Sequence, residues 1–184
     1  TIISTPTTNQ KQHLTKKTSQ LSLYLDTSAH TTILKLNDKK YTYTFANDLA
    51  EKLLSFINEK LIENKKAFTD ITKIIFMSGP GSFTGLRIGC ALVKGMAIGR
   101  PCIGVPTLMA LACNEKASDR VAVALLDARC KQVYMGAYAF DEFGKPVAVI
   151  EDRACAVEEA QRLIEALERP AILLGDGAYL LQGM

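Results

Sequence analysis

The amino-acid sequence predicts an α/β protein in which one order of elements, βββαβα, occurs once and then begins again as βββαβ. Three observations carry this prediction. Short apolar or alternating runs typical of strands are followed by a four-residue helical spacing. The same order returns after Arg120, and in each copy the first strand ends on an acidic residue, Asp26 or Asp127. We therefore expect two sheets in which an antiparallel meander is extended by helix-connected parallel strands.

The first copy begins after a stretch rich in Thr, Gln, Lys and Ser, residues 1–20, which we interpret as a polar tail. Residues 21–26 form an apolar run, residues 31–36 alternate weakly, and residues 41–45 are aromatic and β-branched. These compositions predict three strands joined by short turns.

A change of period then predicts the first helix. Apolar residues recur at every fourth position and form one broad stripe. Asn47 or Asp48 is expected to cap this helix by accepting a backbone hydrogen bond. The stripe consists of Leu49, Leu53, Ile57 and Leu61.

The first copy continues with a strand at 73–77, a glycine-rich loop at 79–85 and a helix at 84–97. A buried strand is expected at 101–105 because the run is apolar. Pro106 suits the start of a further helix at 107–113 because its fixed φ is compatible with a first helical turn.

The second copy repeats this order with different residues. Strands are expected at 121–126, 133–140 and 146–150, followed by an amphipathic helix at 156–167 and a strand at 171–174. Because the strand run ends at a Gly-Asp-Gly turn without a following helix pattern, we expect this copy to be incomplete. The predicted organisation is a tail at 1–20, a first domain at 21–115 and a second domain at 116–184.

The composition excludes several classes of protein. Hydrophobic residues make up 48% of the chain and the net charge is only +3, which is ordinary for a globular protein and weak for direct nucleic-acid binding. No apolar run approaches the roughly 18 residues of a membrane span. The five cysteines are scattered and odd in number, which favours reduced thiols and a cytoplasmic location.

The motif "GPGSFTGLRIG" at residues 79–89 suggests phosphate binding at first reading. A P-loop needs Lys after its last glycine, whereas Leu86 stands here, and the dinucleotide fingerprint needs a shorter glycine spacing. Free N–H groups at a helix start can still attract an anion, and close packing of another helix is the alternative. The phosphate-binding candidates are Asp26, Thr27, Ser28, Gly79 and Gly81.

The sequence offers few residues from which a catalytic or metal site could be built. There are two histidines, and His13 lies in the tail, so an H-x-x-x-H metal site cannot be built. Ser82 lacks the G-x-S-x-G context and has no His after it. We therefore predict no catalytic residue, no metal site and no cofactor required by this chain.

Five segments together resemble the TsaB (YeaZ) family of tRNA threonylcarbamoyladenosine (t6A) biosynthesis proteins. The resemblance runs from about Leu21 to the end of the chain, and the glycine motif is its most specific part. The segments are "LDTSA" at 25–29, "SGPGSFTGLRIG" at 78–89, "GVPTLMALA" at 104–112, "LLDARCKQVYMGAY" at 125–138 and "LLGDGAYL" at 173–180.

This resemblance implies a duplicated actin-like fold of the ribonuclease-H type. It implies a non-catalytic scaffold or activator that pairs with the TsaD subunit, which transfers threonylcarbamoyl to adenosine 37 of tRNA. It further implies the ATPase TsaE as a partner, tRNA contact through the complex, ATP or ADP only in that complex, and homodimers as another assembly. Members of this family have also been called glycoproteases of the M22 type.

The resemblance places the partner interface on the first helix and on the glycine-loop helix, with a helix pair from each partner. A small actin-fold ATPase or kinase that binds nucleotide at Asp26–Ser28 is the alternative function, and a peptidase is a third. The interface residues are Leu49, Leu53, Ile57, Leu61, Gly85, Leu86, Ile88, Gly89, Leu92 and Met96.

Overall fold

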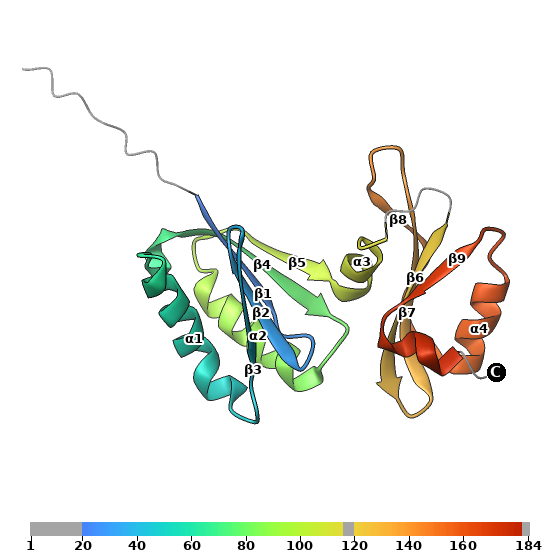
Figure 1. Ribbon diagram of the computed structural model, residues 1–184, viewed down its shortest axis with the longest axis horizontal. Helices are drawn as coiled ribbons and strands as arrows, with labels where there is room; N and C mark the ends of the chain where they lie inside the picture. Colours follow the sequence, from blue (N-terminus) through green and yellow to red (C-terminus); the bar gives the residue numbers. More distant parts are fainter. Residues whose placement is uncertain (1–19, 116–119, 182–184) are drawn as a thin grey trace, which may run out of the picture.

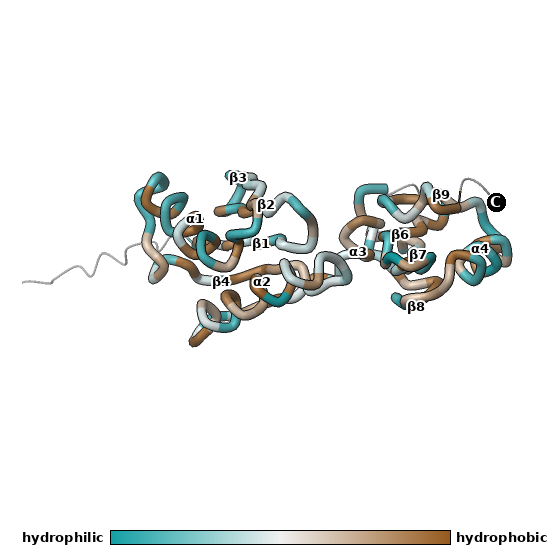
Figure 2. The backbone as a smooth tube through the Cα atoms, turned by 90° about the horizontal axis from the view of Figure 1, so that it is seen from below, coloured by the Kyte–Doolittle hydropathy of each residue, from teal (hydrophilic) through white to brown (hydrophobic). Residues whose placement is uncertain are grey.

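The computed structural model describes residues 20–115 and 120–181, so the predicted tail lies almost entirely outside the described residues. The chain forms two halves that lie side by side along the long axis of the molecule (Figures 1 and 2). Each half contains one mixed sheet, with strand order β3-β2-β1-β4-β5 in the first and β8-β7-β6-β9 in the second. The duplicated α/β organisation predicted from the sequence is therefore confirmed.

The first sheet is built around β1 (Leu21–Asp26). It pairs antiparallel with β2 (Thr31–Leu36) and parallel with β4 (Ile71–Gly79). The edges are β3 (Lys39–Thr44) and β5 (Cys102–Pro106). Alternate residues of β1 are buried, as expected for a strand with one face on the core.

Two helices cover that core face: α1 (Leu49–Glu63) and α2 (Phe83–Met96). The prediction that the side chain of Asn47 or Asp48 caps α1 through a hydrogen bond is wrong. Asp48 occupies the N-cap position, but its side chain makes no capping hydrogen bond. Instead, Asp48 Oδ2 lies 2.5 Å from Lys52 Nζ, and this ion pair lowers the pKa of Asp48, chiefly through the hydrogen bond to Lys52.

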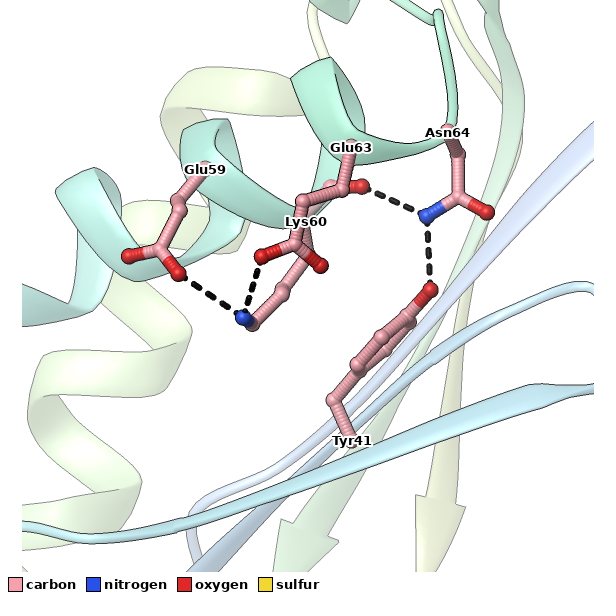
Figure 3. Close-up of polar contacts among 5 residues, drawn as sticks. All are labelled: Tyr41, Glu59, Lys60, Glu63 and Asn64. Atoms are coloured by element: carbon pink, nitrogen blue, oxygen red, sulfur yellow. Dashed lines mark hydrogen bonds and ion pairs between the residues drawn. The ribbon is translucent and has the colours of Figure 1, made fainter.

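The C-terminal end of α1 is tied to β3 by a polar network (Figure 3). Lys60 Nζ donates to Glu59 Oε1 at 2.8 Å and to Glu63 Oε1 at 2.7 Å. Asn64 Nδ2 donates to Tyr41 Oη at 2.6 Å and to the Lys60 carbonyl at 2.7 Å. Asn64 thereby satisfies a carbonyl at the end of α1 and fixes the helix against the edge of the sheet.

One arginine, Arg100, joins three elements just after the C-terminal end of α2. Arg100 Nε donates to the carbonyl of Ile71 at 2.8 Å, and its Nη1 donates to that of Met96 at 2.6 Å. Its Nη2 reaches the carbonyl of Phe68, in the short 3-10 helix η1 (Phe68–Asp70), at 3.2 Å. A cation at the C-terminus of a helix also complements the helix dipole.

The second sheet contains β6 (Val121–Arg129), β7 (Gln132–Phe140), β8 (Pro146–Ala156) and β9 (Ala171–Leu174). Strand β8 is longer than the predicted 146–150, because its pairing with β7 continues through a bulge as far as Gln132 and Ala156. Helix α4 (Val157–Glu165) packs on one face of this sheet. A 3-10 helix, η2 (Asp176–Leu181), follows β9.

The short helix α3 (Thr107–Ala112) lies between the two halves in Figure 1. Leu108 and Ala112 share a core cluster with Ala122, Ala124 and Tyr138 of the second sheet. By sequence α3 belongs to the first copy, but its buried side chains pack with the second. The second sheet is thus covered by α3 on one face and by α4 on the other.

Candidate functional site

The predicted phosphate-binding turn follows β1 and is held by hydrogen bonds within the chain. Asp26 Oδ1 accepts the Ser28 N–H at 2.8 Å and the Ser28 hydroxyl at 2.6 Å. The Tyr24 hydroxyl donates to Asp26 Oδ2 at 3.5 Å. Burial and the neighbouring Asp26 carboxylate raise the pKa of Tyr24 to about 12. This is an Asx turn in which the carboxylate stabilises the local backbone.

The glycine motif packs directly on that turn. A Cβ at Gly85 would overlap the Thr27 carbonyl oxygen, and one at Gly89 would overlap Thr27 Oγ1. The Ser82 N–H donates to the Ser28 carbonyl at 2.6 Å. Ser82 is the N-cap of α2 and accepts the Gly85 N–H at 3.2 Å. The motif therefore joins α2 to the β1–β2 turn of the same chain.

The second copy repeats the arrangement around Asp127. Asp127 Oδ1 accepts the Arg129 N–H at 2.7 Å, and Oδ2 lies 3.2 Å from Arg129 Nη1. The Tyr179 hydroxyl donates to Asp127 Oδ2 at 3.3 Å, and the Asp127 N–H donates to Asp176 Oδ1 at 3.1 Å. In both copies, a carboxylate near the end of the first strand accepts the N–H two residues later and a tyrosine hydroxyl.

A cleft of about 570 Å³ separates the two halves at these turns. It brings together Ser28 and Gly81, two of the five predicted phosphate-binding residues. Thr27 instead points toward α2, and Gly79 faces Leu86. Arg129 and Asp176 were not predicted from the sequence. Two sequence features could have pointed to them: the second copy also has a first strand with an acidic residue, Asp127, near its end, and Asp176 lies in a G-x-G turn. The charged and hydroxylic residues that line the cleft include Ser28, Thr107, Asp127, Arg129 and Asp176.

The predicted partner interface is only partly at the surface. Leu53 is 1% exposed, and Ile57 and Leu61 are fully buried in the core of their own half. Gly85 and Gly89 are also buried. The apolar stripe of α1 therefore faces its own sheet, and the prediction of a surface contact is wrong for these five residues. Met96 is buried as well, with 9% of its surface exposed. Partly buried positions in the predicted set are Leu49, Leu86, Ile88 and Leu92.

A mostly apolar set of residues, which shares Leu92 and Met96 with the predicted interface, lines the outer side of the two helices. Leu54 of α1 is 48% exposed. Together with residues of α2 and its flanks it lines an open cavity of about 480 Å³. Gly95 there has no atom within 4 Å of the position of a Cβ, so the helix backbone is bare. We name this surface the α1–α2 face, formed by Leu54, Phe68, Ala91, Leu92, Gly95, Met96 and Arg100.

Other candidate chemistry is sparse in the described part of the chain. No group of three or more His, Cys, Asp and Glu side chains lies close enough to hold a metal ion among the described residues. The five cysteines are free thiols. No helix within the described ranges is both long and apolar enough to cross a membrane.

Comparison with known proteins agrees with the resemblance noted in the sequence. The sequence model of the family described as TsaD, tRNA N6-adenosine threonylcarbamoyltransferase, matches residues 44–173, well over half of the chain. The solved structure of YeaZ from Pseudomonas aeruginosa superposes with a TM-score of 0.69 at 26% identity, covering 90% of this chain and 80% of that one. With the observed strand order, this confirms the duplicated actin-like fold of the ribonuclease-H type.

Two curated relatives are named tRNA threonylcarbamoyladenosine biosynthesis protein TsaB. TsaB of Escherichia coli K12 is 38% identical over 99 residues, which cover 51% of this chain and 42% of the relative. TsaB of Bacillus subtilis 168 is 33% identical over 117 residues, covering 62% and 51%. The chain thus spans about half the length of these relatives. The chain belongs to the family of TsaD, the tRNA N6-adenosine threonylcarbamoyltransferases, and its relatives there are the TsaB (YeaZ) proteins.

Proposed function

We propose that this chain acts in t6A biosynthesis as an accessory subunit that docks on a TsaD-like transferase through the α1–α2 face. The name shared by its relatives, tRNA threonylcarbamoyladenosine biosynthesis protein TsaB, supports the pathway. The apolar cavity on the α1–α2 face carries the docking part of the proposal. In this proposal the transferase subunit supplies the chemistry, and contact with tRNA or with a TsaE-like ATPase occurs through the assembled complex.

The surface of the two helices suits a helical partner. Leu54 exposes 48% of its surface, and Ile62, two turns further along α1, exposes 65%. The bare backbone at Gly95 allows close approach of another helix, because no side chain keeps the two helices apart. Exposed apolar patches of this kind mark interaction surfaces, and a second copy of the chain would be a competing occupant.

Leu54→Glu tests this surface because it places a charge on the face without entering the core. Its matched control is Ile103→Glu, since Ile103 is also 48% exposed but lies in β5, paired with Ile75 on the opposite face of the sheet. Affinity for the cognate TsaD-type subunit is measured by biolayer interferometry. Burying an unpaired carboxylate in an apolar contact should weaken binding at least about tenfold in Leu54→Glu. Unchanged binding in Leu54→Glu with loss in Ile103→Glu would refute the proposed face.

The alternative function is that of a nucleotide-dependent enzyme. The fold contains a cleft that could hold a nucleotide, but the side chains around it give this alternative weak support. The cleft between the halves is large enough for a nucleotide, and Ser28 and Gly81 line it. However, the carboxylates of Asp26 and Asp127, which would position a hydrated metal ion, already accept hydrogen bonds from Ser28 and Arg129. The accessory role is therefore the better-supported function.

A further inference from the structure

The outer face of the first sheet lies opposite α1 and α2. Leu21, Leu23 and Leu25 of β1 belong to the core cluster that these helices cover. Since successive side chains of a strand point to opposite faces, Ser22 and Tyr24 lie on the outer face. This face is on the far side of the sheet from the α1–α2 face, so one surface can be occupied without blocking the other.

One row of paired residues crosses four strands of the outer face. Tyr24 pairs with Ile75 of β4 on one side and with Lys35 of β2 on the other. Lys35 pairs in turn with Lys40 of β3. Residues opposite each other on neighbouring strands project from the same face, so an aliphatic side chain, an aromatic ring and two ammonium groups stand side by side.

The neighbouring row adds a third lysine and a polar cavity. Lys73 of β4 pairs with Ser22. The Ser22 N–H and hydroxyl both donate to Asn37 Oδ1, at 2.8 and 3.0 Å, which extends this row to the turn between β2 and β3. A cavity of about 420 Å³ opens here, and none of the described residues that line it is acidic. Its lining is Gln20, Ser22, Asn37, Thr72, Lys73 and Pro101. We name the surface formed by the two rows the outer basic face: Ser22, Tyr24, Lys35, Asn37, Lys40, Lys73 and Ile75.

The three lysines of the outer basic face form no ion pair in the described part of the chain. On α1, by contrast, Lys52 and Lys60 are both paired with carboxylates. Lys35 Nζ instead lies 5.3 Å from the centre of the Tyr24 ring. Like charges directly opposite on neighbouring strands destabilise a sheet, and Lys35 and Lys40 are such a pair. A bound anion would relieve this repulsion.

The acidic residues near this face do not cancel its charge. Asp26 follows Tyr24 on the same side of β1, but its carboxylate already accepts hydrogen bonds from Tyr24 and Ser28. Asp38 lies in the turn between β2 and β3, outside both rows. Neither row contains a carboxylate. The net charge of the whole chain, +3, therefore understates the positive potential at this surface.

We propose that the outer basic face binds a single-stranded segment of RNA. The phosphates lie beside the three lysines, one of them in the cavity at Lys73, and the bases pack on Tyr24 and Ile75. Apolar side chains between basic ones suit a polymer in which charged phosphates alternate with planar bases, whereas an acidic protein segment offers the apolar residues no such partner. The choice of RNA rests on the proposed function, in which this face is the chain's own contact with the tRNA held by the complex.

The test measures binding of a fluorescein-labelled oligouridylate to the full chain by fluorescence anisotropy, over a range of salt concentrations. Three phosphate contacts on a single strand give a slope of log affinity against log salt of about −2. Lys35→Gln combined with Lys40→Gln should weaken binding about tenfold at low salt and bring the slope to about −0.7. The same double variant should resist urea at least as well as the parent chain, because it removes a repulsion. A parent slope near zero, or unchanged binding by the double variant, would overturn the proposal.

Lys65→Gln combined with Lys94→Gln is the matched control. Both lysines are exposed, and they lie near the end of α1 and on α2. The control makes the same change in net charge on the helix side of the sheet, so its affinity for RNA should stay within about twofold of the parent value. Equal losses in the two double variants would show attraction by the overall charge and would refute the face.

A glutamate peptide with as many negative charges as the oligouridylate separates RNA from an acidic protein partner. It should bind the parent chain at least about fivefold more weakly, because it has no bases to pack on Tyr24 and Ile75. Equal affinity for the two polymers would overturn the assignment to RNA.

This proposal and the docking proposal fail separately, because the two surfaces lie on opposite sides of the first sheet. Lys35→Gln with Lys40→Gln should keep the parent affinity for the TsaD-type subunit, and Leu54→Glu should keep the parent affinity for RNA. A chain that docks on that subunit without binding RNA would overturn the outer basic face alone.

Discussion

Gly89 lies against Thr27 so closely that a Cβ on the glycine would overlap Thr27 Oγ1 and come within 3.3 Å of Thr27 Cβ. The contact joins the middle of α2 to the turn that follows β1. A helix can approach a strand end this closely only where it carries no side chain. The glycine motif therefore serves packing inside the chain, while the bare surface available to a partner lies at Gly95.

This contact predicts opposite effects for two glycines of the same helix. Gly89→Ala should lower the free energy of unfolding by about 2–3 kcal/mol, because the added methyl group has no space beside Thr27. Gly95→Ala should raise it by about 0.5–1 kcal/mol, because alanine favours the helix and meets no atom within 4 Å. Urea unfolding at equilibrium measures both. Equal changes in the two variants would show that α2 does not pack on the β1–β2 turn as described.

Arg100 should contribute to stability through its three backbone acceptors. Arg100→Met keeps the length of the side chain but leaves the carbonyls of Ile71, Met96 and Phe68 without this donor. We expect a loss of about 2 kcal/mol in the free energy of unfolding, since hydrogen bonds to charged groups are stronger than neutral ones. Arg100→Lys, which retains the charge but not the planar fork, should recover less than half of that loss in the same assay.

The two aspartate turns predict weak nucleotide binding by the isolated chain. Asp26 and Asp127 are each engaged by the N–H two residues later, and rotating either carboxylate toward a metal ion would break that turn. Calorimetric titration with MgATP should therefore show no binding tighter than millimolar. Asp127→Asn should leave the titration unchanged. Micromolar binding that is lost in Asp127→Asn would make the cleft a nucleotide site.

The sequence predicts the strands and helices well because their periods are local properties. The strands at 21–26, 31–36 and 171–174 agree with the structure residue for residue. Strand β8 is underestimated, because Glu151, Asp152 and Arg153 interrupt the apolar pattern. They are tolerated there since β8 is an edge strand whose side chains are largely exposed.

The sites depend on tertiary structure and are harder to predict. A four-residue spacing identifies the apolar stripe of α1 but does not say what covers it, and here Leu53, Ile57 and Leu61 pack on their own sheet. Leu54, one residue away, is the exposed neighbour. The cleft between the halves is assembled from separate segments, so Ser28 and Arg129 gave no joint signal in the sequence.

Light scattering after size exclusion, with the chain alone and then mixed with its cognate TsaD-type subunit, tests the central claim most directly. Our account predicts a stable complex with one copy of each protein, formed by the parent chain and by Ile103→Glu but not by Leu54→Glu. Separate elution of the two proteins at micromolar concentration, with the chain folded, would contradict the proposed accessory role.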